Sequence, residues 1–189
     1  KERNVMIESG WVTHILHSNI DDNAYCEELF QYLLSTYGNE WPNSFSQIDI
    51  LKNKEHKNPI LDQAGQYIQN SVEHFFQTAF GIVPKHYTKT FATHHQNIGL
   101  HQHQGSLISG VFYVYCNSGD LRLHDPRVNA QRGYPNELQS YFKPKVLQPK
   151  TGDLVLFPSF LQHEVSNNKS NEPRVIMPFD VFGDLDNFE

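Results

Sequence analysis

Cysteine and long apolar runs are both scarce in this chain of 189 residues. The two cysteines, Cys26 and Cys116, lie far apart and form neither a Cys-x-x-Cys pair nor a zinc-type spacing. No apolar run approaches the roughly 20 residues that a membrane helix needs, and segment 1–15 lacks the apolar stretch of a signal peptide. We therefore expect a reduced, cytoplasmic protein with no disulfides and no membrane association.

Positive charge is also in short supply. Lysines and arginines number 15 against 21 aspartates and glutamates, which gives a net charge of -6 with neutral histidines. This balance argues against general binding to nucleic acid or to anionic membranes. Charged residues make up only 19% of the chain, whereas hydrophobic residues make up 38%, so the composition excludes a disordered protein.

The hydrophobic pattern changes near residue 86, within a length that predicts one domain, 1–189. Residues 1–85 show helical spacing, and we interpret them as a helical N-terminal support region. In residues 86–189 the period is two, and short runs rich in aromatic and β-branched residues alternate with Gly and Pro clusters. This pattern predicts a sandwich, a barrel or a double-sheet jelly roll, with the helices packed on one face of the sheet.

Two helices are expected in the N-terminal region. The first follows Asp21 and Asp22, which can cap its N-terminus, and the second follows Asn58 in the same role. Gly81 is the expected C-terminal stop of the second helix. Between the helices, residues 47–51 alternate weakly and predict a strand.

Histidine is unusually frequent, with eleven in the chain. His101 and His103 are two residues apart, so in a strand they point to the same face. His163 follows the apolar run 153–158, a predicted strand that could lie opposite. Three imidazoles that converge in a sheet-walled cavity form a site suited to iron, copper, zinc or nickel. Incidental polar histidines are the alternative interpretation.

Other side chains suggest ligand contacts. Arg174 opens the last predicted strand, and its planar guanidinium suits a carboxylate bound beside a metal. Tyr113 lies in the strand after the His-x-His pair and can donate its hydroxyl to the same carboxylate. A solvated edge arginine and a packed core tyrosine are the competing interpretations. The long excursion at 125–143, with Arg127 and several aromatic residues, suggests a lid or a substrate loop for a molecule with ring-packing and anionic parts, and an ordinary surface loop is the alternative.

Four segments follow one another along the chain: HQHQGSLISGVFYV (101–114), LHDPR (123–127), PKTGDLVLFPSFLQHEV (149–165) and RVIMPF (174–179). Together they resemble the iron(II)/2-oxoglutarate-dependent oxygenases. More narrowly, they are similar to small oxygenases of bacteria and their phages that carry such His-x-His, Ser-Gly-Val, Asp-Pro-Arg and Phe-Pro-Ser-x-x-x-His segments. The ordered set is more specific than any one segment.

The resemblance implies an α+β, mainly β chain with a double-stranded β-helix, the cupin-like jelly roll, and N-terminal helices packed on one sheet. It implies a dioxygenase that uses Fe(II), 2-oxoglutarate and dioxygen to hydroxylate an unidentified substrate, with release of succinate and CO2, in a bacterial or phage-infected cell. In the family pattern His-x-Asp/Glu…His…Arg, His101 and His163 fall on the two histidines. Arg174 falls on the arginine that pairs with the far carboxylate of 2-oxoglutarate, and Tyr113 falls where some relatives place a second partner.

His103 departs from this pattern because it stands at the carboxylate position. We expect a three-histidine site with His103 as the third ligand. The alternative makes His103 the first ligand and leaves the next position, Gly105, empty, as in halogenase-type relatives. Ile176 also stands where many relatives carry a hydroxyl, so one cofactor hydrogen bond is expected to be missing.

Rival functions remain on the same fold, since a fold alone does not determine function. One is a non-catalytic, metal-binding, cupin-like sensor, and another is a structural jelly roll with incidental histidines. A zinc hydrolase is a third, with Glu164 as a weak candidate base. The sequence names neither the prime substrate nor the oligomeric state, and a homodimer stays open.

Overall fold

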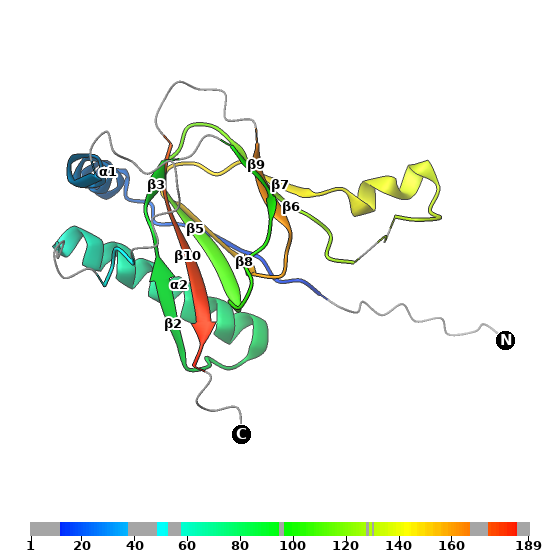
Figure 1. Ribbon diagram of the computed structural model, residues 1–189, viewed down its shortest axis with the longest axis horizontal. Coiled ribbons are helices and arrows are strands. Elements are labelled where there is room, and N and C mark those ends of the chain that lie inside the picture. The colour runs from blue at the N-terminus through cyan, green and yellow to red at the C-terminus, as the bar shows by residue number, and fades with distance from the viewer. Residues whose placement is uncertain are drawn as a thin grey trace.

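The computed structural model describes residues 12–37, 49–52, 58–94, 97–127, 129, 131–166 and 174–184. Two antiparallel β-sheets face each other, and two helices cover the outer face of the larger sheet (Figure 1). Neither helix in these described ranges is long and apolar enough to cross a membrane.

The larger sheet has six strands in the order β1-β8-β5-β10-β2, with β3 paired to the beginning of β10. Its strands are β1 (Leu16–Asn19), β2 (His86–Thr90), β3 (Thr93–His94), β5 (Ile108–Tyr115), β8 (Asp153–Pro158) and β10 (Val175–Gly183). The smaller sheet has the order β4-β9-β6-β7. Its strands are β4 (Ile98–His101), β6 (Asp120–Leu123), β7 (Lys145–Leu147) and β9 (His163–Ser166).

The helices α1 (Asn23–Tyr37) and α2 (Pro59–Phe80) begin at capping residues that the sequence predicts, and α2 also ends at one. The Asp22 carboxylate accepts a backbone hydrogen bond from the first turn of α1, and the Asn58 side chain does the same for α2. Gly81 ends α2 with a φ of 74°, a left-handed conformation that glycine adopts without a steric penalty. Both predicted helices are confirmed.

The helices bury one face of the larger sheet. Phe112 and Val114 of β5 point toward them and have no exposed surface. Phe30 of α1 stacks on Tyr115 with ring centroids 4.6 Å apart, and Tyr67 of α2 meets Phe112 edge-on at 5.4 Å. The prediction that the helices pack on one sheet is therefore confirmed.

A second apolar cluster fills the space between the two sheets. It includes Tyr113 of β5 and Phe157 of β8 from the larger sheet, with Leu121 of β6 and Val165 of β9 from the smaller one. Every residue of β8 is buried, because helices cover one face of this strand and the smaller sheet covers the other. Two sheets packed face to face in this way form the predicted jelly roll.

The N-terminal region differs from expectation in its strands. Asp49 accepts a hydrogen bond from the Leu51 backbone, and residues 50–52 form a turn instead of the predicted strand, whose residues 47 and 48 lie outside the described ranges. The unpredicted strand β1 pairs with β8 along its whole length. The division into regions 1–85 and 86–189 stays a prediction, although β1 already adds a strand from the first region to the jelly roll.

The excursion between β6 and β7 contains a 3-10 helix, η3 (Asn136–Phe142), in which no residue is buried. Tyr134 packs on Phe142 at 4.8 Å, and the Arg127 guanidinium lies over the same Phe142 ring at 5.7 Å. The excursion extends outward from the two sheets and does not fold over them (yellow in Figure 1).

Candidate metal centre

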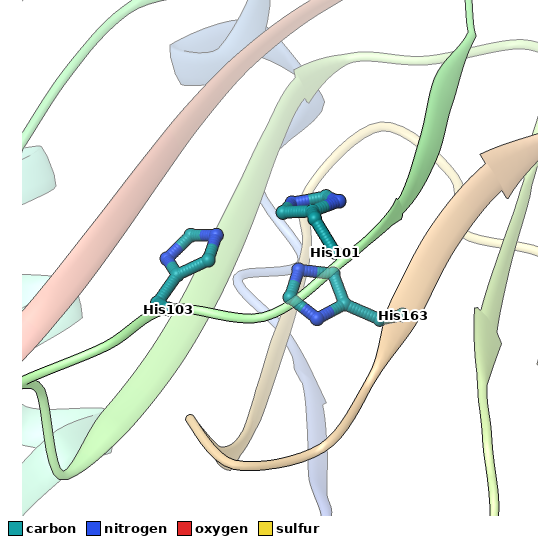
Figure 2. Close-up of side chains that lie close together, drawn as sticks. All are labelled: His101, His103 and His163. Atoms are coloured by element: carbon teal, nitrogen blue, oxygen red, sulfur yellow. The ribbon is translucent and has the colours of Figure 1, made fainter.

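His101, His103 and His163 come together where β4 ends, with their rings facing one another (Figure 2). His101 ends β4 and His163 begins β9, and the register places these two residues directly opposite each other. The centroids of their rings lie 4.1 Å apart, and the His103 ring lies 5.2 Å from His101 and 5.1 Å from His163. One ring nitrogen from each lies within 4.8 Å of the others, so one metal ion can contact all three after small ring rotations.

The sequence predicted this group of three but not its exact support. His103 lies two residues beyond the end of β4, in a segment without regular secondary structure, and not within a strand. The predicted strand 153–158, β8, does lie in the opposite sheet, but His163 itself begins β9, the strand beside β4. The three side chains still converge, because neighbouring strands bring opposed residues to the same face.

Each of the three histidines has its Nδ1 within hydrogen-bond distance of an oxygen that can only accept. The acceptors are the Gly99 carbonyl for His101 at 2.8 Å, the Leu161 carbonyl for His163 at 2.9 Å, and the Asp180 carboxylate for His103 at 2.7 Å. Nδ1 therefore carries the proton in each ring. Each Nε2 is left with a lone pair for a metal, which is the usual arrangement of metal-ligating imidazoles.

Burial keeps two of these rings neutral. It lowers the pKa of His163 to about 4, and the neighbouring imidazoles of His101 and His103 act in the same direction. Burial also lowers the pKa of His101. A metal binds the unprotonated imidazole, so both side chains are ready to bind one at neutral pH.

Arg174 lies immediately before β10 and is only 1% exposed. Its Nε and Nη1 have no hydrogen-bond acceptor. Within the described ranges of the chain, no carboxylate lies within ion-pair distance of this guanidinium. A buried cation without a counter-charge is unfavourable, so this side chain is suited to an anionic ligand.

Tyr113 lies beside Arg174, with the guanidinium carbon 5.3 Å from the centre of its ring. Its hydroxyl is buried and has no hydrogen-bond partner. Burial raises the pKa of Tyr113, so the hydroxyl keeps its proton and can donate it to an anion. Arg174, Tyr113 and the three histidines all line one pocket between the sheets.

Thr93 is a candidate that the sequence analysis missed. It lies in β3 directly opposite Ile176 of β10, so both side chains face the same pocket. The Thr93 hydroxyl is buried and unpartnered. It thus brings from the neighbouring strand a hydroxyl of the kind that Ile176 lacks. No motif marks Thr93, because only the pairing of β3 with β10 brings it to the site.

Two other residues named by the sequence lie outside the group of three. Glu164 follows His163 in β9 and therefore points to the opposite face, where it pairs with His124 at 3.3 Å. Gly105 lies in the turn after His103 with a φ of 82°. Neither residue contributes a side chain to the metal centre.

The sequence also matches a protein-family model, described as "Putative 2OG-Fe(II) oxygenase", over residues 89–180. The match runs from β2 through the three histidines and Arg174 to Asp180. The matched part of the chain is that of a 2OG-Fe(II) oxygenase. These enzymes are oxidoreductases that depend on iron(II) and 2-oxoglutarate, as the resemblance in the sequence implied. No relative was found among curated proteins.

Solved structures share the fold of this oxygenase. HygX from Streptomyces hygroscopicus, crystallised with iron bound, has a TM-score of 0.61 and 12% identity over 91% of this chain and 83% of its own. A prolyl-4-hydroxylase from Pseudomonas putida has a TM-score of 0.59 and 12% identity over 89% of this chain and 92% of its own. At such low identities the likeness shows the fold alone, and it confirms the predicted double-stranded β-helix.

Proposed function

We propose that this oxygenase binds iron(II) through His101, His103 and His163. The supporting observation is the pocket between the sheets, which has three inward-facing imidazoles at one place and an unpaired guanidinium at another. Imidazole nitrogens suit iron(II), and three protein ligands leave coordination positions free for a cosubstrate. The donor set therefore fits the metal on which the family depends.

We assign the far carboxylate of 2-oxoglutarate to Arg174, with Tyr113 and Thr93 as additional donors. The guanidinium offers a planar fork for the carboxylate, and the two buried hydroxyls complete its hydrogen bonds. Bound iron(II) would supply the activation of dioxygen, coupled to conversion of 2-oxoglutarate to succinate and CO2 and to oxidation of the substrate. Apolar residues of both sheets exclude water from this pocket.

The geometry favours the three-histidine site over the alternative with an empty position. His101 is the residue directly opposite His163, and its ring is the closest to the His163 ring. A site built on His103 and His163 alone would leave His101 inside the group without a role. Hydroxylation stays the proposed outcome of the reaction.

The prime substrate has a candidate entry point beside the metal centre. The loop after β8 touches both histidine segments, since the Ser159 carbonyl accepts from the His103 backbone at 3.3 Å and the Leu161 carbonyl accepts from the His163 ring. Phe160, between them, is 60% exposed. It lines a cavity of about 610 Å³ together with Leu161, the residue whose carbonyl contacts the His163 ring.

The lining of this cavity suggests the chemical class of the substrate. Val12, Ile15, Leu123, Pro126, Phe160 and Leu161 give it apolar walls. Arg127 also lines it and is bound to Asp125. Lys143 and Lys145 line its rim and have no ion-pair partner within the described residues. We propose a substrate with an apolar body and an anionic group, as the excursion at 125–143 suggested.

Metal binding tests the ligand assignment. We expect His101→Ala, His103→Ala and His163→Ala each to reduce iron(II) occupancy strongly, because each removes one of three ligands. His74→Ala changes an exposed histidine of α2 and is the matched control. Full metal affinity in His103→Ala with loss in His101→Ala would overturn the three-histidine site.

Turnover tests the reaction. Succinate formation from 2-oxoglutarate should require iron(II) and should rise when a cell extract is added as a source of substrate. Binding of metal and 2-oxoglutarate with no succinate formed, with or without extract, would favour the sensor over the enzyme.

A further inference from the structure

Asp180 in β10 holds its carboxylate against His103. The Asp180 Oδ1 accepts a hydrogen bond from His103 Nδ1 at 2.7 Å. The same oxygen accepts another, also of 2.7 Å, from the hydroxyl of Ser109, which the register places directly opposite in β5. Asp180 itself lies outside the four motif segments and is not one of the proposed metal ligands.

A chain of three serine hydroxyls fixes this carboxylate. Ser106 donates to Ser159 at 2.8 Å, and Ser159 lies 2.9 Å from Ser109. Because Ser109 gives its single proton to Asp180, Ser159 must donate to Ser109, and all three protons run toward the carboxylate. Ser109 and Ser159 are 2% and 1% exposed, so the orientation of Asp180 is held by the protein interior.

His103 differs from the other two histidines in the charge of its partner. His101 and His163 donate to neutral backbone carbonyls, whereas His103 donates to a carboxylate. His103 is also the residue that stands where the family carries its acidic ligand. An acidic group is thus still present beside this ligand position, but it is the carboxylate of Asp180, which lies behind the His103 ring and not at the metal position.

We propose that Asp180 is a positioning residue of the metal centre, which holds His103 in the Nδ1–H tautomer and supplies the negative charge that the family's carboxylate ligand would bring. The proposal rests on the three-histidine site proposed above. A carboxylate behind a ligating imidazole fixes the ring and raises its basicity, and loss of such a partner typically reduces metal affinity about 10- to 100-fold.

The first test measures metal affinity without turnover. Anaerobic titration with Co²⁺, followed by its visible absorption, should give a dissociation constant about 10-fold or more higher in Asp180→Asn than in wild type. Asp153→Asn is the matched control, because Asp153 also pairs with a histidine, His17 at 3.1 Å, but takes no part in the centre. Equal affinity in wild type and Asp180→Asn, with both proteins folded, would overturn the proposal.

A double-mutant cycle separates relayed charge from general damage. In a His103→Asp background the acid is already a ligand, so the further change Asp180→Asn should no longer weaken Co²⁺ binding. In this background Asp180→Asn should change the dissociation constant for Co²⁺ by no more than about twofold, the usual error of additivity. With His103 present the same change should raise it about 10-fold or more. The same loss in both backgrounds would mean that Asp180 has only a structural role.

The metal-free protein gives an independent readout. Long-range proton–nitrogen NMR spectra of the imidazoles should show His103 as the Nδ1–H tautomer in wild type and as a mixture in Asp180→Ala. An unchanged tautomer in Asp180→Ala would contradict the positioning role. A different outcome would show that the proposed metal site is wrong: wild type has the Nδ1–H tautomer but binds no Co²⁺, or His163→Ala binds Co²⁺ as tightly as wild type. Such a result can be told apart from a failure of the role proposed for Asp180.

Discussion

Replacing Arg174 with methionine removes the guanidinium but keeps an unbranched chain in its place. In wild type the buried guanidinium has two nitrogens without acceptors and no carboxylate partner within the described residues. Methionine removes this uncompensated charge, and such replacements are often neutral or stabilising. We therefore expect Arg174→Met without ligand to be at least as stable as wild type, in contrast to most changes of a residue that is 1% exposed.

Binding of 2-oxoglutarate should respond in the opposite way. Truncating one partner of a desolvated, hydrogen-bonded charge pair costs about 2–5 kcal/mol. This corresponds to a loss of affinity of about 30-fold to several thousand-fold. Arg174→Lys should recover only part of it, because an ammonium cannot form the two parallel bonds of the guanidinium.

Two assays on the anaerobic, Mn²⁺-loaded protein give these values. Isothermal titration measures the affinity for 2-oxoglutarate directly. In thermal melts, ligand at 100 times its Kd stabilises wild type by about 2.7 kcal/mol, which for this size is a shift in Tm of about 5–10 °C. Arg174→Met should shift by no more than about 3 °C at that concentration. Equal affinity in wild type and Arg174→Met would refute the reasoning and move the carboxylate to another residue.

Two predictions concern packing and substrate. A Cβ on Gly110 would lie 2.3 Å from Phe179 and 2.5 Å from Leu156, so Gly110→Ala should lower the free energy of unfolding by about 1–3 kcal/mol in urea titrations. Gly99→Ala is the control, because Gly99 has open space around it, and equal losses in the two variants would contradict the packing argument. An extract can be separated on an anion-exchange column, and the amount of the retained fraction that gives half-maximal succinate formation can then be measured. Lys145→Glu should raise this amount about fivefold, whereas Lys150→Glu, which lies outside the cavity, should leave it unchanged. Stimulation found only in the unretained fractions would exclude an anionic substrate.

The helices were predictable because their signals are local. Asn58 and Gly81 mark the two ends of α2 through chemistry that acts within one turn of the chain, and an apolar stripe lies between them. The strand β1 was not predictable in this way, since its LHSN sequence carries little apolar pattern and its place depends on pairing with β8. Asp49 shows the reverse error, where a weak alternation suggested a strand but an aspartate side chain stabilises a turn.

The candidate site divides along the same line. His101, His103 and Arg174 were found because they lie in short segments with fixed spacing. Thr93 and Asp180 carry no such mark. They reach the site through pairing with strands that are distant in sequence, so only the three-dimensional register identifies them.

Strand β10 and the residue that precedes it alternate between two environments. Arg174, Ile176 and Asp180, at even positions, face the pocket or the metal centre. Val175 and Met177, at odd positions, pack into the cluster beneath the helices. Stability and chemistry are thus encoded in one stretch of sequence at alternating positions. A mutant library restricted to the odd positions would vary the support of the sheet while leaving cofactor and metal contacts in place, and one restricted to the even positions would do the opposite.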